Sequence, residues 1–178
     1  MYRAMGKNFF SIIFYSFYIF EGNYIEFKKT IDSYIKAADS DEFLSSSEKS
    51  IELHIYGGRE LSRRIHNYAA AWLSLVDHTR VISEKLKDHD SADIRGFSDE
   101  YDSKLKDSLK DTFENVFVKD LRRYVQHKKV PVPALHFKMQ RIEDISSEAN
   151  EPLFEGGPSF DFHSKDIEDF NWSPKVKE

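Results

Sequence analysis

The segment LRRYVQHKKVPVP, residues 121–133, contains residue types that can act on a phosphodiester. Arg122 and His127 stand there with four residues between them. A histidine can transfer protons near neutral pH, and an arginine can bind a phosphate and stabilise charge that develops on it. On RNA, such a base could activate the 2′-hydroxyl against the adjacent phosphate. Arg122 and His127 are therefore candidate catalytic residues of a site without metal or cofactor.

Three more cations, Arg123, Lys128 and Lys129, surround this pair. The formal net charge of the chain is −5, so the surface as a whole will not attract nucleic acid, and any contact needs a local basic patch. We predict that these three residues bind the substrate through its phosphate backbone. A structural interpretation stands beside this one, because basic residues also favour the C-terminal end of a helix.

The spacing of Arg122 and His127 sets a geometric condition on the site. Five residues along a regular helix rotate the side chain by about 140° net, so the two would not share a face. They would converge if the helix ends or distorts near His127, which Pro131 and Pro133 favour. Alternatively, a second copy across a dimer axis would bring Arg122 of one chain close to His127 of the other.

Two long amphipathic helices are predicted to position these residues. The first covers residues 59–87 and carries an apolar stripe in steps of three and four, which favours packing in a helical bundle. The second begins near Ser98 as the N-cap and ends before the prolines. The stripe of the first helix is Leu61, Ile65, Tyr68, Trp72, Leu75, Thr79, Ile82 and Leu86.

Shorter patterns predict the remaining elements. Residues 23–38 have helical periodicity. Residues 51–56, IELHIY, alternate as in a short strand, with the start of a helix as the alternative. Gly57 and Gly58 are expected to break the chain. Residues 134–142 could form a second strand, and a hairpin with residues 51–56 is one pairing open to it.

The two ends of the chain differ from the middle in composition. Residues 9–20 form an apolar run of about twelve residues, shorter than the roughly 20 that span a bilayer. We expect a buried helix or strand there, with a signal or membrane anchor as the alternative. The predicted organisation is an N-terminal hydrophobic extension (1–22), a helical domain (23–140) and an acidic, loosely docked tail (141–178).

Composition and the positions of the other histidines exclude several kinds of site. The chain has no cysteine, which excludes disulfides and thiolate sites, and 40% hydrophobic with 32% charged residues favours a globular protein of the cytoplasm. His66 and His78 lie about 18 Å apart on one helix and cannot share a metal. We expect them to be surface or interhelical hydrogen-bonding groups, with Asp77 and Arg80 available to support a neighbouring site.

The segment LRRYVQHKKVP resembles the closing R-x4-6-H motif of the HEPN superfamily (higher eukaryotes and prokaryotes nucleotide-binding). RRIHNYAAAWLSLVDHTR is similar to the long helix of bacterial HEPN-like proteins, and the resemblance covers roughly residues 23–133. It implies a mainly α fold, an antiparallel helical bundle that often dimerises with the two motifs meeting at the interface. The position after the motif arginine is commonly polar, often Asn, whereas this chain has Arg123.

The resemblance implies two functions that remain open. Active members are metal-independent endoribonucleases, frequently toxins or defence effectors, with His127 as the proton-transfer residue and Arg122 as the phosphate-binding one. Inactive members are helical modules that bind a nucleotide or a protein partner. We expect a homodimer that acts on single-stranded RNA and does not depend on a membrane.

Overall fold

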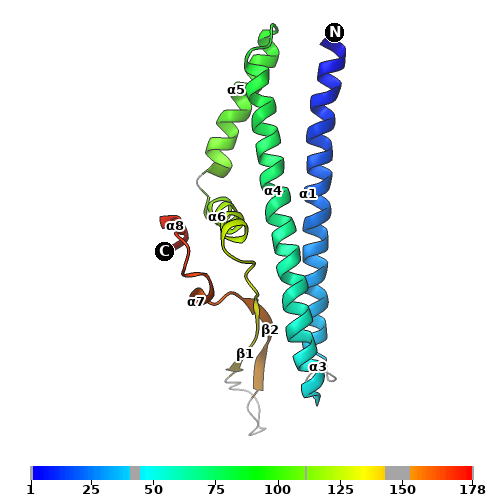
Figure 1. The fold of residues 1–178 in the computed structure, drawn as a ribbon, viewed down its shortest axis with the longest axis vertical. Helices are drawn as coiled ribbons and strands as arrows, with labels where there is room; N and C mark the ends of the chain where they lie inside the picture. The colour runs from blue at the N-terminus through cyan, green and yellow to red at the C-terminus, as the bar shows by residue number, and fades with distance from the viewer. Residues whose placement is uncertain (1, 41–44, 111, 143–152, 178) are drawn as a thin grey trace. The chain divides into compact units, whose positions relative to one another are not determined.

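The computed structural model describes the chain except for residues 1, 41–44, 111, 143–152 and 178. The described part is mainly helical, with one small antiparallel sheet of two strands (Figure 1). The chain divides into two compact units. The first contains Met1–Phe27, Arg64–Val130 and Phe170–Glu178, and the second contains Lys28–Arg63 and Pro131–Asp169.

Helix α1 (Tyr2–Ala38) and helix α4 (Gly58–Lys87) pack antiparallel in the first unit. Aromatic rings fill the contact, with Phe20 centred 5.3 Å from Trp72 and 5.7 Å from Tyr68. The Ser16 hydroxyl lies 2.6 Å from Nδ1 of His78, which confirms the expected interhelical role of that histidine. The apolar stripe of residues 59–87 is thereby confirmed as a helix-packing face.

The apolar run at residues 9–20 is helical, but it is not buried as expected. α1 continues without interruption from Tyr2 through residue 22 to Ala38. Its inner face contacts α4, while Phe14 and Tyr18 keep about two thirds of their surface exposed, 65% and 66%. None of the described helices combines the length and hydropathy needed to cross a membrane.

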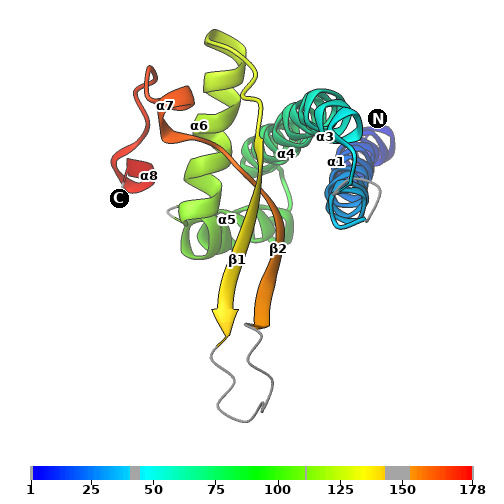
Figure 2. The same cartoon turned by 90° about the horizontal axis from the view of Figure 1, so that it is seen from below.

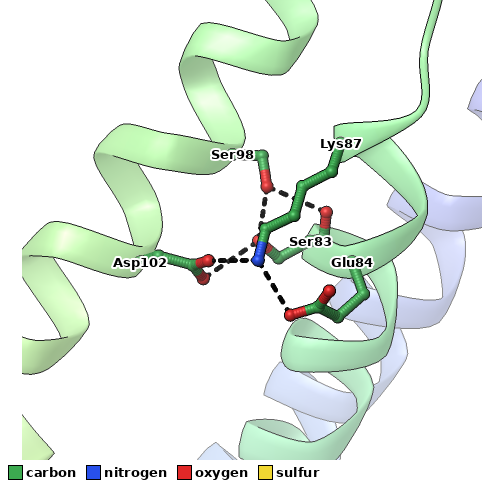
Figure 3. A network of polar contacts seen from close by, with 5 residues as sticks. All are labelled: Ser83, Glu84, Lys87, Ser98 and Asp102. Atoms are coloured by element: carbon green, nitrogen blue, oxygen red, sulfur yellow. Dashed lines mark hydrogen bonds and ion pairs between the residues drawn. The ribbon is translucent and has the colours of Figure 1, made fainter.

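Helix α5 (Ala92–Leu105) is joined to α4 by a polar network (Figure 3). Ser98 is fully buried, and its hydroxyl donates a hydrogen bond to the Ser83 carbonyl at 2.8 Å. The Ser83 hydroxyl donates to Asp102 at 3.2 Å, and the Lys87 ammonium lies 2.7 Å from the same carboxylate. Glu84 accepts a second contact from Lys87, at 2.8 Å.

This network corrects the prediction that Ser98 is an N-cap. Ser98 lies inside α5, and Ser91 holds the N-cap position. The predicted second long helix is also divided. A π-helical segment, η2 (Lys106–Lys110), follows α5, and helix α6 (Phe113–His127) starts anew at the Thr112 cap, whose hydroxyl accepts a hydrogen bond from the Asn115 N–H at 3.3 Å.

The end of the chain docks on α6, which corrects the expectation of a loosely attached tail. Trp172 is only 7% exposed, and its ring stacks on Tyr124 and Phe117 with centroids 5.6 and 6.1 Å away. The N–H of Ser173 donates a 2.6 Å hydrogen bond to the buried carboxylate of Asp120. The short helix α8 (Pro174–Lys177) follows directly.

The second unit holds the sheet and the turns around the start of α4. Strand β1 (Ala134–Ile142) pairs antiparallel with strand β2 (Leu153–Asp161), from Ala134 opposite Asp161 to Ile142 opposite Leu153. Tyr34, on the C-terminal part of α1, meets Phe160 of β2 edge to face at 6.3 Å. The short helix α7 (Ser164–Ile167) completes this unit.

The predicted strand at residues 51–56 is wrong, and so is its pairing with residues 134–142. Helix α3 (Ser47–Glu52) and the π-helical segment η1 (Leu53–Gly57) occupy this stretch. Gly57 and Gly58 do not break the chain, because helical backbone passes through both into α4. A Cβ on Gly57 would lie 3.0 Å from the Tyr34 ring, so the glycine provides close approach rather than a turn.

The packing of Trp172 predicts a large stability loss on truncation. Trp172→Ala should lower the free energy of unfolding by about 3–5 kcal/mol, because it leaves a cavity between the tail and α6. Phe97→Ala is the matched control, since Phe97 is 62% exposed and its truncation should change stability by less than about 0.5 kcal/mol. Urea denaturation measures both, and equal effects would contradict the docked tail.

The network of Figure 3 predicts a pH-dependent contribution from Asp102. The hydrogen bond from Lys87 lowers the pKa of Asp102 below its ordinary value. Its contribution is therefore complete above the unfolded-state value of about 4 and is lost as the pH falls through the lower folded-state value. Asp102→Asn should lower the thermal unfolding midpoint near neutral pH, and the difference from wild type should shrink below about pH 4. A difference that stays constant with pH would exclude this role.

Candidate functional site

The predicted site residues lie on and just after the last two turns of α6. The sequence builds this end simply. The helix ends at His127, where the Lys128 N–H closes the final turn on the Tyr124 carbonyl at 2.8 Å, and Pro131 follows in the chain. The apolar side of α6, on which Leu121 and Tyr124 are buried, determines which side of the helix faces inward.

Arg122 points from α6 toward α4. Its Nη1 lies 3.9 Å from the Asp77 carboxylate, and Arg80 approaches the other oxygen of that carboxylate at 3.3 Å. A separation of 3.9 Å is an electrostatic contact rather than a hydrogen bond. The Arg122 side chain is 32% exposed, while its Nε is shielded from solvent without a hydrogen-bond partner among the described residues. An anion can reach the guanidinium only through the exposed third of the side chain.

His127 is exposed at the end of α6 and lies away from Arg122. α6 is a regular helix through both positions, so the rotation of about 140° between them applies. Within the described residues, no hydrogen bond or ring contact joins the two side chains. The structure therefore brings Arg122 together with Asp77 and leaves the imidazole facing solvent.

Arg123 shares a helix face with His127, because the two are four residues apart. Its Nη1 lies 3.4 Å from the buried Asp120 carboxylate, and its guanidinium lies 5.5 Å from the centre of the Phe170 ring. The side chain remains 55% exposed, so one side is held by the tail while the other faces solvent. Arg123 is thus the cation placed along the helix beside the imidazole.

Lys128 and Lys129 complete the group directly after the helix, and both are exposed. Here the α6 end is defined as Arg122, Arg123, His127, Lys128 and Lys129. Asp77 and Asp120 contact its two arginines, while the group itself joins four cations and a histidine in a chain that is acidic overall. This end of α6 can attract a phosphate backbone.

Sequence reasoning identified Asp77 as a supporting residue but missed Asp120. The signal was present, because Asp120 falls on the apolar side of the helix, between Phe117 and Tyr124. A carboxylate in such a position must find partners when it is buried. Phe170 and Ser173, which supply contacts here, lie about fifty residues further on, and nothing local connects them with α6.

The other histidines lie elsewhere. His66 is exposed on α4, with Nδ1 3.4 Å from its neighbour Asn67. The rings of His136 and His163 meet edge to face in the second unit, with centroids 5.0 Å apart. Across the described residues, no three His, Asp or Glu side chains are grouped so as to hold a metal ion.

No protein-family model matches this chain, and no curated protein or solved structure is significantly similar to it.

The two carboxylates that contact the α6 end should differ in their effect on stability. Asp120→Ala should cost about 2–3 kcal/mol, because it leaves the Ser173 N–H without its charged acceptor. Asp77→Ala should cost less than about 1 kcal/mol, since its ion pairs are long and half exposed. Chemical denaturation of both variants gives the comparison. A larger loss for Asp77→Ala would mean that the contact between α4 and α6 depends on Asp77 instead.

Proposed function

We propose that this protein is a metal-independent endoribonuclease of the HEPN type that acts at the α6 end as a toxin or defence effector in the cytoplasm. The observation that carries the proposal is a solvent-exposed imidazole among four cations where one helix ends. The Arg122 side chain, which is 32% exposed, adds a second guanidinium at this end of the helix.

The reaction needs only groups of this chain and the RNA. His127 accepts the proton of a 2′-hydroxyl, and the 2′-oxygen attacks the adjacent phosphorus. The bond from phosphorus to the 5′-oxygen breaks, and that oxygen takes up a proton, which gives a 2′,3′-cyclic phosphate and a free 5′-hydroxyl. A guanidinium stabilises the charge on the non-bridging oxygens.

Arg122 is the proposed phosphate-binding residue, and its separation from His127 sets the form of the complex. A single strand that wraps the α6 end can contact Arg122 with one phosphate and His127 with a neighbouring ribose. Alternatively, Arg123 holds the phosphate at His127, because these two residues share a face. A homodimer that joins two α6 ends would provide a third arrangement.

A second function rests on a different observation. Arg122 and Arg123 are both engaged by carboxylates of the same chain, Asp77 and Asp120, at 3.9 and 3.4 Å. This favours a structural role for the motif in a non-catalytic helical module that binds a nucleotide or a protein partner. The two functions differ in whether His127 is needed for any activity on RNA.

Cleavage of single-stranded RNA in excess chelator separates the two functions. Wild-type protein should yield fragments that end in a 2′,3′-cyclic phosphate, which mass spectrometry identifies. His127→Ala should lower the cleavage rate by about 100-fold or more, the usual contribution of proton transfer. Arg122→Ala and Arg123→Ala then show which guanidinium stabilises the transition state, since only that variant should approach the loss seen for His127→Ala.

The matched control is His66→Ala, which removes an exposed histidine from α4 and should leave the rate within about twofold. Thermal unfolding confirms that each variant is folded. Absence of cleavage by the wild type, or cleavage that is unchanged in His127→Ala, would exclude the enzyme and leave the binding module.

A further inference from the structure

The outward face of α1 is a large apolar surface without charge over about three turns. No charged residue occurs from residue 9 to residue 20. The helix side opposite α4 exposes Phe14 at 65%, Tyr15 at 63%, Tyr18 at 66% and Ile19 at 56%. A helix that is apolar all round is usually buried on all sides. These four apolar side chains are therefore directed into solvent.

Five residues define the centre of this surface, here called the α1 seam, and their spacing is symmetric. They lie within about 40° of one helix direction at 100° per residue. Counted from Tyr18, they stand four and seven residues before and after it. The members of the α1 seam are Ser11, Phe14, Tyr18, Gly22 and Ile25.

With this spacing, a two-fold axis pairs large side chains with small ones. An antiparallel copy of the helix, related by a two-fold axis at Tyr18, places Phe14 opposite Gly22 and Ser11 opposite Ile25. Gly22 is open for this contact, because a Cβ built there meets no atom within 4 Å. The same operation sets Tyr15 opposite Glu21, where the phenol can donate a hydrogen bond to the carboxylate.

We propose that two copies of this chain associate through the α1 seam, antiparallel about an axis at Tyr18. Phe14 and Ile25 then cover Gly22 and Ser11 of the partner, and the two Tyr18 side chains meet at the axis, as in a self-complementary two-fold interface. The ridge Phe14–Tyr18–Gly22 has a spacing of four residues, which favours a crossing angle of about −50° and places the closest contacts around Tyr18. The inference goes beyond the proposed function and does not depend on it.

The exposed area of the seam fits a small interface between two copies. An aromatic side chain buries roughly 150–250 Å² when it is fully covered, and Phe14, Tyr15 and Tyr18 are 63–66% exposed, so these rings offer on the order of 400 Å² per copy. Ile19 and Ile25, at 56% and 43% exposure, add to this area. The interface therefore lies at the lower end of the size range, below the about 800 Å² per partner of an interface of standard size.

The charged residues of α1 have both signs, with Arg3 and Lys7 before the seam, Glu21 and Glu26 beside it, and Lys28 and Lys29 after it. Helices that lie on membranes carry Lys and Arg on the polar face next to the apolar one. The residues in that place beside the seam are Glu21 and Glu26, which favours a second copy over an anionic membrane surface. Gly22 also permits close approach of a helix.

The α1 seam keeps the two α6 ends apart. Within the first unit, α4 lies between α1 and α6, as both views show (Figures 1 and 2). The side-chain contacts agree with this arrangement. Ser16 of α1 contacts His78 of α4, and Arg122 of α6 contacts Asp77 of α4. A dimer through the opposite side of α1 therefore carries two separate α6 ends on its outer sides. It is an alternative to the arrangement in which two motifs meet.

Mass measurement by analytical ultracentrifugation tests the seam on the full chain at micromolar concentration. Wild type should be a dimer, and Gly22→Lys should raise the dissociation constant at least about tenfold while the fold stays intact, because position 22 is open in the single copy. Tyr18→Glu should act likewise, since it places two carboxylates at the axis. Val81→Lys is the control, as Val81 is 46% exposed on α4 outside the seam, and it should not change the mass.

The register has its own test. Phe14→Ala weakens the dimer, and adding Gly22→Phe in the same chain should restore it, because each large ring again faces a small residue. The chain lacks cysteine, so Tyr18→Cys alone should be cross-linked by a short bismaleimide, and Val81→Cys should not. Cleavage of RNA should be unchanged in Gly22→Lys, which separates failure of this interface from failure of the nuclease.

Three results would overturn the proposal. The first is a monomeric wild type. The second is a dimer that persists in both Gly22→Lys and Tyr18→Glu, which would place the interface elsewhere. The third is a monomer that sediments with phosphatidylcholine vesicles and loses this binding in Tyr18→Glu, which would assign the same face to a membrane surface.

Discussion

The buried carboxylate of Asp120 is the interaction on which the arrangement of α6 depends. Its exposed fraction is 1%, and a charge in such a place is unfavourable unless it is paired and hydrogen-bonded. Its two oxygens have different partners, the Ser173 N–H at 2.6 Å and Arg123 at 3.4 Å. The tail must therefore dock for α6 to hold this residue inside. Trp172 adds the apolar contact that makes the docking favourable.

The orientation of α6 follows from this contact, and the candidate site follows from the orientation. Once Asp120, Leu121 and Tyr124 face inward, the helix rotation directs Arg122 to Asp77 of α4 and leaves His127 in solvent. Arg123 is held partly by the tail through Phe170. The tail thus contributes to the presentation of the cations, although it supplies none of the proposed catalytic groups.

The sequence predicted those parts of the fold in which periodicity is long and uninterrupted. The stripe of α4 covers seven intervals, and the structure has the helix within one residue of the predicted start. The break between α5 and α6 was missed, because Leu105, Leu109 and Phe113 continue the apolar spacing across the π-helical segment η2. The strand predicted at residues 51–56 was wrong for a related reason. Alternation over six residues does not separate a strand from a helix whose inner face is set by packing.

In the candidate site, too, only the residues that are close together in the sequence could be predicted. Residue types and spacing identified Arg122, His127 and their basic neighbours, since these are local in the sequence. The place of Asp120 on the apolar side of the helix was a signal of burial, but its partner Ser173, and Phe170 beside Arg123, were not predictable, because they lie about fifty residues further along the chain. Arg122 and His127 lie on different sides of α6 because the helix is regular up to His127. The prolines that follow do not distort it there, contrary to one of the arrangements that the sequence left open.

A titration that follows individual side chains by NMR would test the central claim most directly. The ligand would be a single-stranded RNA with 2′-O-methyl groups, which binds but lacks the attacking hydroxyl. The account predicts that the His127 imidazole and an arginine side chain of the α6 end shift together with RNA concentration, and that His66 and His163 do not. Shifts that leave His127 unchanged would contradict the assignment of the α6 end as the RNA site.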